Sequence, residues 1–399
     1  MKKFIKNILC LILILFLIGY IYDNRDKTKE MIATLEIYTK AITVSEYEYT
    51  EEFKINDIKV STNNFYYNKL NENQKKIYTS LANGIRELKK EIILKNYEYV
   101  DNQTSLDDIE IVFNYFCLDH PEVFYLNNSY IVSNVSSLIG NNVIIEVEYS
   151  VESLEELEYK VEKINEVIDI YLKDAKNVDK VDSEIILHDR LAQDVKYYEY
   201  EKIEDIPSSC HTIEGAFLNK EAVCEGLSKA LEVLLSNVEI KNIVELGKLE
   251  ETPHAWNMVK LDDKWYNLDI TSNKSIKLEN DENIVIHVYF NVSDEEIIST
   301  HELTDKDILP VSNELDEKYN YYIHTKKYIK TGDNFKKELS NIISMNQNEY
   351  ILEFYTEDMK NASKNIYETL LLTNKDEYLK NNQFIYYNIL NTYIIVKNR

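Results

Sequence analysis

One stretch decides how the middle of the chain is built: Ala222-Val223-Cys224-Glu225-Gly226-Leu227-Ser228-Lys229-Ala230-Leu231. Apolar residues follow helical spacing from Leu227 onward, so we expect a helix that begins at or near Cys224. Unpaired backbone N–H groups at the start of a helix favour negative charge, and they stabilise a thiolate placed there. Glu225 acts in the opposite direction, so Cys224 needs a nearby base before it can be a strong nucleophile.

Two segments further along the chain offer a base and an acid: His254-Ala255-Trp256-Asn257 and Trp265-Tyr266-Asn267-Leu268-Asp269. Both are typical of strands, and Asp262-Asp263 has the composition of a turn between them. A loop of two or four residues would place His254 and Asp269 on one face of the hairpin, whereas a loop of three would separate them. The even register therefore predicts that Asp269 orients His254, and that His254 takes the proton of Cys224.

These three motifs, in the order Cys, His, Asp, resemble those of the transglutaminase-like superfamily. The resemblance is strongest over residues 184–300, and it extends to four flanking motifs: Asp119-His120-Pro121-Glu122-Val123-Phe124-Tyr125, His188-Asp189-x-Leu191, His211-x-x-x-Gly215-Ala216 and Tyr289-Phe290-x-Val292-Ser293-Asp294. It implies an α+β fold with a transglutaminase-like, papain-like core. It also implies a site in which Cys224 is the nucleophile, His254 the base and Asp269 the residue that orients this base.

The resemblance further implies cysteine-dependent acyl transfer or hydrolysis on protein or peptide amides. Cys224 would form a thioester, and the acyl group would pass to an amine or to water. Trp256 and His211 are expected to line the oxyanion or substrate groove, with the backbone N–H of Cys224 as an oxyanion donor. Neither a cofactor nor a metal is expected. The alternative is a non-catalytic surface module of the same fold that binds peptide or envelope components.

Plainer interpretations of the same residues stay open. Three cysteines lie beyond the N-terminal segment, so Cys224 could form a disulfide with Cys117 or Cys210. Trp256 and Trp265 have the apolar area of core residues. We expect no zinc site, because no close-pair ligand spacing joins Cys210, His211, Cys224 and His254.

The composition and the N-terminal segment indicate which partners and which location to expect. The chain has 399 residues, 70 Asp+Glu against 45 Lys+Arg and a formal charge of −25, which argues against nucleic acid as a partner. A basic start, Met1-Lys2-Lys3, and an apolar run from Ile8 to Tyr22 predict a signal or an uncleaved membrane anchor over residues 1–26. We therefore expect an extracytoplasmic protein, held at the cell membrane by this helix or secreted, whose substrate is a protein or peptide.

Helix and strand patterns divide the remaining chain into three parts. Residues 27–180 are expected to be mainly helical with a small sheet, residues 181–309 to form the core, and residues 310–399 to form a small α+β domain. In the first part we expect helices over 27–46, 71–94 and from Leu157, and strands over 130–135 and 143–151. In the last part we expect strands over 319–325, 350–355, 384–388 and 392–397, with helices over 334–345 and 361–372.

Overall fold

The computed structural model describes residues 55–58, 60, 64–94, 102–137, 140–274, 276–277, 283–313, 317–329, 334–345, 351–356, parts of 362–369, 385–389 and 392–396. The anchor expected over residues 1–26 and the helix expected over 27–46 lie outside these residues. No helix within the described ranges is long and apolar enough to cross a membrane.

The chain forms two compact units that are not continuous in sequence. The first contains Leu70–Asn114 and Leu126–Ser150, and the second contains Lys54–Lys69, Tyr115–Tyr125 and Val151–Arg399. Both mix helices with mainly antiparallel sheets, as an α+β fold does. The boundaries expected at residues 180 and 309 stay predictions, since these compact units divide the chain at other places.

The first unit has a three-stranded antiparallel sheet of order β1-β3-β2 and two helices. The strands are β1 (Glu91–Leu94), β2 (Leu126–Ser137) and β3 (Gly140–Tyr149). The helices are α3 (Glu72–Arg86) and α4 (Asn102–Asp119), and the last residues of α4, from Tyr115, belong to the second unit. The strands expected over 130–135 and 143–151 are thereby confirmed.

The helix expected over 71–94 was wrong beyond residue 86. The Asn71 side chain caps α3 at its start, and α3 ends at Arg86. Leu88 has a positive φ of 53°, which reverses the chain. Ile92 then returns in β1 against Gly84, where an added Cβ would lie 2.6 Å from Ile92 Cγ1. The apolar spacing continued past the turn because both elements bury residues in one core.

Three longer helices belong to the second unit: α5 (Leu154–Ala175), α6 (Lys180–Asp194) and α7 (Cys224–Ser236). The side chains of Ser153 and Asp179 accept backbone N–H bonds and so cap α5 and α6. The helix predicted to begin at Cys224 is confirmed, and no side chain caps its first turn. Its initial N–H groups therefore have no side-chain acceptor.

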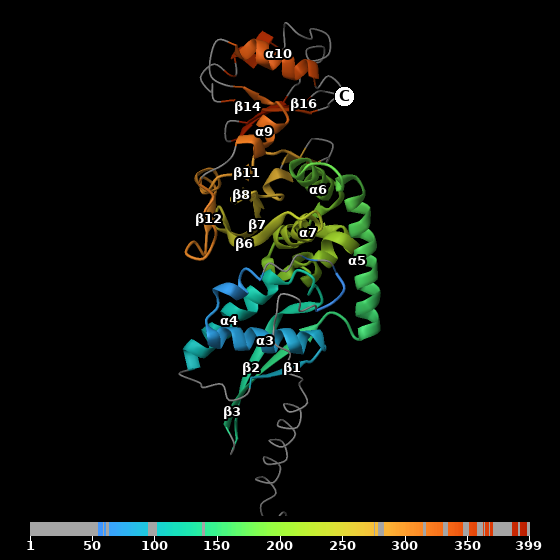
Figure 1. Ribbon diagram of the computed structural model, residues 1–399, viewed down its shortest axis with the longest axis vertical. Helices are drawn as coiled ribbons and strands as arrows, with labels where there is room; N and C mark the ends of the chain where they lie inside the picture. Colours follow the sequence, from blue (N-terminus) through green and yellow to red (C-terminus); the bar gives the residue numbers. More distant parts are fainter. Residues whose placement is uncertain are drawn as a thin grey trace, which may run out of the picture. The chain divides into compact units, whose positions relative to one another are not determined.

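A five-stranded antiparallel sheet of order β11-β8-β7-β6-β12 is the centre of the second unit. Its strands are β6 (Lys241–Leu249), β7 (Thr252–Leu261), β8 (Lys264–Leu268), β11 (Phe290–Val292) and β12 (His301–Leu303). Helix α7 packs against β6 and β7, as Figure 1 shows. Strands β7 and β8 are joined by a two-residue turn, with Leu261 opposite Lys264.

Short elements complete this core. The parallel pair β4 (Lys196–Tyr197) and β5 (Glu221–Ala222) precedes α7. A 3₁₀ turn over Ser208–His211 and a π-helical turn over Gly215–Asn219 lie between these two strands in sequence. The short helix α8 (Asp294–Ile297) begins with a capping box between Ser293 and Glu296. The pair β9 (Ile276–Lys277) and β10 (Asn283–Ile284) forms a separate hairpin.

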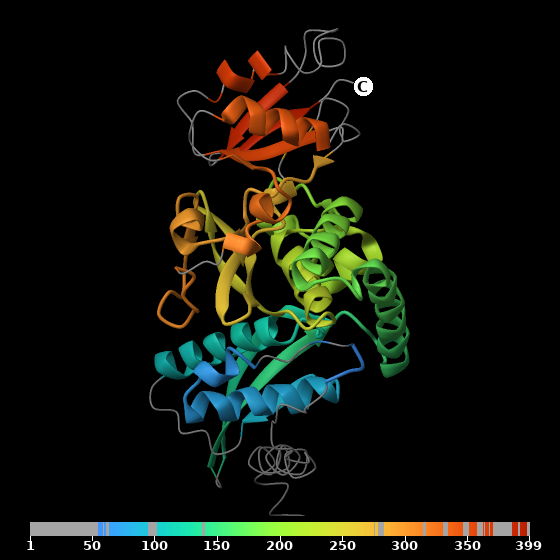
Figure 2. The same cartoon turned by 45° about the horizontal axis from the view of Figure 1, so that its top comes forward.

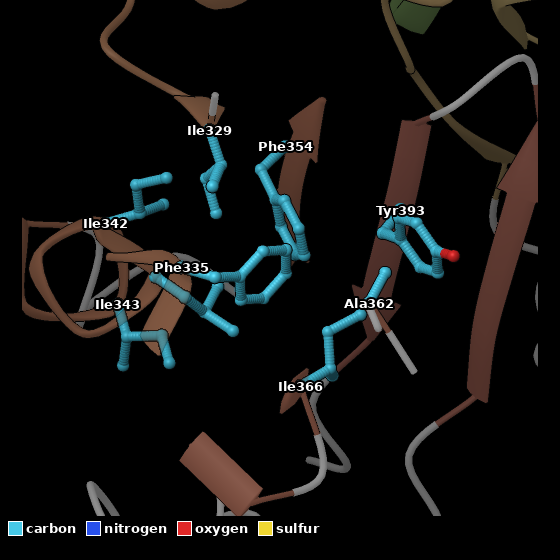
Figure 3. Packing of buried hydrophobic residues seen from close by; sticks show 9 residues of the cluster. Ile329, Phe335, Ile342, Ile343, Phe354, Ala362, Ile366 and Tyr393 are labelled. Carbon is cyan, nitrogen blue, oxygen red and sulfur yellow. The ribbon is translucent and has the colours of Figure 1, made fainter. Parts of the chain in front are cut away.

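The C-terminal part of the second unit has a four-stranded sheet of order β13-β14-β16-β15. Its strands are β13 (Tyr328–Ile329), β14 (Ile351–Thr356), β15 (Ile385–Ile389) and β16 (Thr392–Val396). Helix α10 (Phe335–Met345) lies across this sheet (Figure 2). Figure 3 shows the apolar core between them, formed by Ile329, Phe335, Leu339, Ile342, Ile343, Phe354, Ala362, Ile366 and Tyr393.

One strand expected in this region was wrong. Residues 319–325 form the end of a 3₁₀ turn, Glu317–Tyr319, followed by the short helix α9 (Tyr321–His324). The Asn320 side chain accepts N–H bonds from Tyr322 and Ile323, and this cap starts the helix. The aromatic content of the segment indicated a strand, but the local cap determines its structure.

Candidate active site

Cys224 is the first residue of α7 and is a half-buried, free thiol. The preceding 3₁₀ turn is held against this helix end, because Val223 N–H donates to the Cys210 carbonyl at 3.0 Å. Gly226 permits this approach, since an added Cβ would lie only 2.3 Å from Cys210 O. Cys117 and Cys210 are also free, so neither of the two disulfides weighed from the sequence forms.

His254 and Asp269 meet as the even register predicts. His254 lies on β7, Asp269 directly follows β8, and the His254 Nε2 to Asp269 Oδ2 distance is 2.9 Å. Cys224 lies near enough to the His254 ring to be among the groups that raise its pKa. Because Nε2 is occupied by Asp269, Nδ1 is the ring nitrogen left for Cys224. The structure thus brings the three predicted residues together in the order Cys224, His254, Asp269.

The electrostatics of the site favour a charged histidine. Burial by itself lowers the pKa of His254, but the Asp269 carboxylate, the hydrogen bond to it and the neighbouring Cys224 raise it from 6.5 to about 10. Burial favours the neutral form of Asp269, yet His254 and His301 hold the pKa of this carboxyl well below its usual range. His254 is therefore an imidazolium, and Asp269 a carboxylate, at neutral pH.

The Asp269 carboxylate is held by more than His254. Its Oδ1 accepts the backbone N–H groups of Thr271 at 2.8 Å and Ser272 at 3.0 Å. Its Oδ2 accepts a hydrogen bond from a second histidine ring, because His301 Nε2 lies 2.9 Å away. Four donors thus surround one fully buried carboxylate.

Sequence reasoning missed His301 because nothing local to it indicates this contact. His301 begins β12, which pairs with β6 and not with β7 or β8. Its side chain is 32 residues from Asp269 in sequence, and only the order of strands in the sheet brings the two together. Neither spacing nor periodicity within one segment could have indicated the pair.

Trp256 does not contribute an oxyanion donor. It is fully buried, and its indole N–H donates to Asn267 Oδ1 at 3.2 Å. Its ring lies 6.1 Å from that of His254 and 5.1 Å from that of His301, measured between centroids. Trp256 is therefore a core residue that packs beside both histidines, as the alternative interpretation of this tryptophan expected.

His211 binds a neighbour of Cys224, and its expected place in the oxyanion or substrate groove stays a prediction. Its Nδ1 lies 3.0 Å from Glu225 Oε2, while Lys229 Nζ lies 2.7 Å from Glu225 Oε1. Burial raises the pKa of Glu225, but Lys229 and His211 lower it to about 2. The carboxylate next to Cys224 is thus paired with Lys229 and hydrogen-bonded to His211, which limits its unfavourable effect on a thiolate.

Tyr197 is a further residue near the cysteine that the sequence did not indicate. It ends β4 and lies opposite Ala222 of β5, two residues before Cys224. Burial and the neighbouring Cys224 raise the pKa of Tyr197 well above its usual value of 10. The phenol therefore stays neutral and can act as a hydrogen-bond donor near the thiol.

A second histidine–carboxylate cluster lies elsewhere in the same unit. Asp189 Oδ1 is 2.8 Å from His188 Nδ1 and 2.8 Å from His287 Nε2. His287 Nδ1 lies 2.9 Å from Glu353 Oε2 on β14, so both ring nitrogens of His287 bind carboxylates. Burial lowers the pKa of His287, but Asp189 and Glu353 raise it from 6.5 to about 9.

Three sets of side chains in the described residues have nitrogen and oxygen atoms close enough for a metal ion: His254 with Asp269 and His301, His188 with Asp189 and His287, and Asp179 with Asp182 and His324. In each set a histidine nitrogen is already hydrogen-bonded to a carboxylate, at 2.8 or 2.9 Å. A proton between these atoms accounts for the distances, so hydrogen bonding explains all three sets.

No protein-family model and no curated protein sequence matches this chain. One similar solved structure is described as the crystal structure of a TGase: it is 16% identical with a TM-score of 0.26, and the match covers 39% of this chain and 47% of that one. A second is described as a "Putative Cysteine Protease" from Cytophaga hutchinsonii. It is 10% identical with a TM-score of 0.23, and the match covers 40% of this chain and 66% of that one.

The chain thus spans about half of the first structure and just under two thirds of the second. At these TM-scores and identities the two neighbours do not establish the fold of the core.

Proposed function

We propose that this protein is a cysteine acyltransferase or amidase with a transglutaminase-like core. Cys224 would be the nucleophile, His254 the acid and base, and Asp269 the residue that orients His254. The observation that most supports this proposal is the position of one ring: His254 binds Asp269 at 2.9 Å, and Cys224 lies near enough to raise the pKa of the same ring. That arrangement is the one a cysteine nucleophile needs.

In the first half-reaction, the Cys224 thiolate attacks the carbonyl carbon of an amide and a C–S bond forms, while the carbonyl π electrons move to oxygen. The uncapped first turn of α7 supplies N–H donors, that of Cys224 included, for this oxyanion. Collapse of the intermediate breaks the C–N bond, and the His254 imidazolium gives its proton to the departing nitrogen. A thioester on Cys224 and ammonia or an amine result.

In the second half-reaction, water or a primary amine attacks the thioester carbonyl. His254, now neutral, takes the proton of the attacking group. The C–S bond then breaks, its electron pair returns to the Cys224 sulfur, and His254 is again protonated. Water gives a carboxylate and amine gives a new amide, so the same residues serve hydrolysis and cross-linking. The strong acidic charge of the chain favours a basic protein or peptide as one partner.

The proposal is tested by the reactivity of the thiols in the purified protein. Iodoacetamide at pH 6 should label Cys224 at least roughly tenfold faster than the same cysteine in the urea-unfolded chain. Cys117 is a control within the molecule, because burial raises the pKa of its thiol to about 11. Equal labelling of wild type and the Cys224→Ala variant would exclude a reactive thiol at this position.

The reaction itself needs a second measurement. Wild-type protein with a glutamine-containing protein and a fluorescent primary amine should release ammonia and incorporate the amine, and both signals should vanish in the Cys224→Ala variant. A labelled Cys224 without ammonia release or peptide cleavage would favour the non-catalytic peptide-binding module. Attachment to a membrane through residues 1–26 stays a prediction that fractionation of cells can test.

A further inference from the structure

One carboxylate oxygen at this site accepts hydrogen bonds from two histidines. His254 Nε2 and His301 Nε2 each lie 2.9 Å from Asp269 Oδ2. His301 is also bound at its other nitrogen, because Nδ1 lies 2.9 Å from Thr300 Oγ1. A proton on Nε2 is donated to Asp269, and Nδ1 shares a hydrogen bond with the Thr300 hydroxyl.

We propose that His301 is a positioning residue of this site: by donating a second hydrogen bond to Asp269 Oδ2, it fixes the carboxylate and shares the charge that Asp269 presents to His254. This inference rests on the proposed function. His301 does not touch the thiol in this arrangement, so it acts through Asp269. The chain of contacts is Cys224, His254, Asp269, His301.

The hydrogen bonds at Asp269 explain why a second histidine matters. Backbone N–H groups of Thr271 and Ser272 hold Oδ1, so His301 is the group that completes the set at Oδ2. With all its acceptor positions in use, the carboxylate has no free lone pair for another partner. Removal of His301 would leave Oδ2 to His254 alone, and Asp269 would hold the His254 proton more tightly.

The sheet makes room for the second ring. Gly247 on β6 lies opposite both His254 on β7 and Leu303 on β12. A Cβ at Gly247 would lie 2.6 Å from Trp256 Cη2 and 2.2 Å from the Glu302 carbonyl. The missing side chain therefore allows the Trp256 indole to lie against His254 and His301 together. His301 also packs edge-on against Tyr289, with 5.2 Å between ring centroids.

The titration of His254 tests the proposal without a substrate. Titratable groups surround His254 on two sides. Asp269, His301 and Tyr289 lie on one side, and Cys224 and Tyr197 lie on the side of the thiol. NMR of histidine rings in the full chain should show that His301→Phe, which keeps a ring but has no donor, raises the proton affinity of His254 roughly threefold. His301→Gln restores an N–H donor and should return the midpoint toward that of wild type.

Kinetics with p-nitrophenyl acetate give the second readout. The thioester step should keep its burst in His301→Phe. The following hydrolysis should slow roughly threefold to tenfold, because a smaller fraction of His254 is then neutral and able to act as the base. His301→Gln should recover most of this rate. His120→Phe is the matched control, since His120 is a buried histidine that binds Glu122 at 2.7 Å and does not contact Asp269.

The outcomes separate the two proposals. An unchanged or lowered His254 midpoint in folded His301→Phe overturns the role of His301, whether or not the wild type shows a burst. The same holds if His301→Gln behaves like His301→Phe in both readouts, because His301 would then only fill space. A wild type without a burst above that of Cys224→Ala overturns the proposed function, while the NMR result still decides the coupling through Asp269.

Discussion

Two clusters of the second unit each join two histidines to one aspartate at 2.8 or 2.9 Å, and they differ in what the second nitrogen of one histidine binds. At the candidate site, His254 binds Asp269 through Nε2 and keeps its other nitrogen for Cys224. In the second cluster, His287 binds Asp189 through Nε2 and Glu353 through Nδ1, so no nitrogen is left for a nucleophile. The comparison teaches that a buried, charged histidine is a reactive group only when one of its two ring nitrogens stays available.

The second cluster instead has the properties of a structural contact. Tyr321 stacks on His287 with ring centroids 3.5 Å apart and an interplanar angle of 3°. The Tyr322 hydroxyl donates to Glu353 Oε1 at 2.6 Å, and the His287 backbone N–H donates to the same oxygen at 2.7 Å. Glu353 lies on β14, so this cluster joins the C-terminal sheet to the segment that precedes β11.

The largest expected effect would break the comparison directly. His254→Ala should lower the rate of Cys224 alkylation at pH 6 by about 100-fold to 10,000-fold, because the thiolate loses its counter-ion and base. His287→Ala should leave this rate within about threefold of the wild-type value, since this ring has no contact with the thiol. Stopped-flow alkylation with mass spectrometry measures both. A similar loss in the two variants would show that the clusters do not differ in the way described.

The second effect concerns stability. Glu353→Leu leaves the His287 imidazolium buried with Asp189 as its remaining carboxylate, and it should lower the free energy of unfolding by roughly 3–5 kcal/mol. Asp269→Asn should also lower stability, but its main effect should be on thiol reactivity. Urea unfolding followed by fluorescence measures the difference, with limited proteolysis to locate the loss. Full stability in Glu353→Leu would contradict a structural role for the second cluster.

The third effect is the pH dependence of that stability. Because the pKa of His287 is raised from 6.5 to about 9, its contribution is complete below pH 6.5 and is lost as the pH rises through 9. The loss should amount to about 3 kcal/mol at most for a shift of this size. Urea unfolding at pH 6, 7.5 and 9 checks it. A Glu353→Gln variant should show a shallower decline, and an equally steep one would exclude His287 as the cause.

The smallest effect sharpens the comparison at the turn before His254. Glu250 and Glu251 have positive φ values of 52° and 80° in the loop between β6 and β7, a conformation that costs residues other than glycine energy. Glu251→Gly should therefore stabilise the chain by about 1 kcal/mol. Asp263→Gly is the control, since Asp263 has no positive φ and should give no gain. Thermal unfolding of both variants tests the difference, and the second cluster should be unaffected.

The candidate site was predictable as far as one hairpin determines it. The start of α7 and the His254–Asp269 pair follow from helical spacing and from loop parity, which depend on neighbouring residues. Contacts that depend on strand order were not predictable, and His301 is the main example. The groove role expected for Trp256 was wrong because its ring is fully buried and its N–H is bonded to Asn267 of the next strand. The groove role expected for His211 stays a prediction.

Fold prediction failed in the same way. Strands β2 and β3 of the first unit and β14, β15 and β16 of the C-terminal sheet carried clear β-branched and aromatic patterns, and the structure confirms them. The overlong helix at 71–94 and the misassigned strand at 319–325 failed where one residue changes the path of the chain. Leu88 does this by a positive φ, and Asn320 by its side-chain cap. A structural propensity averaged over a stretch of sequence changes little when one residue in it redirects the chain.

The two-residue turn at Asp262–Asp263 constrains how this chain can change in length. One inserted or deleted residue there would turn Asp269 to the opposite side of its hairpin, whereas a change of two residues would preserve its facing and shift it along the strand. Related sequences that retain the chemistry should therefore differ by even numbers at this loop. Odd-length variants should survive only where a bulge restores the original parity.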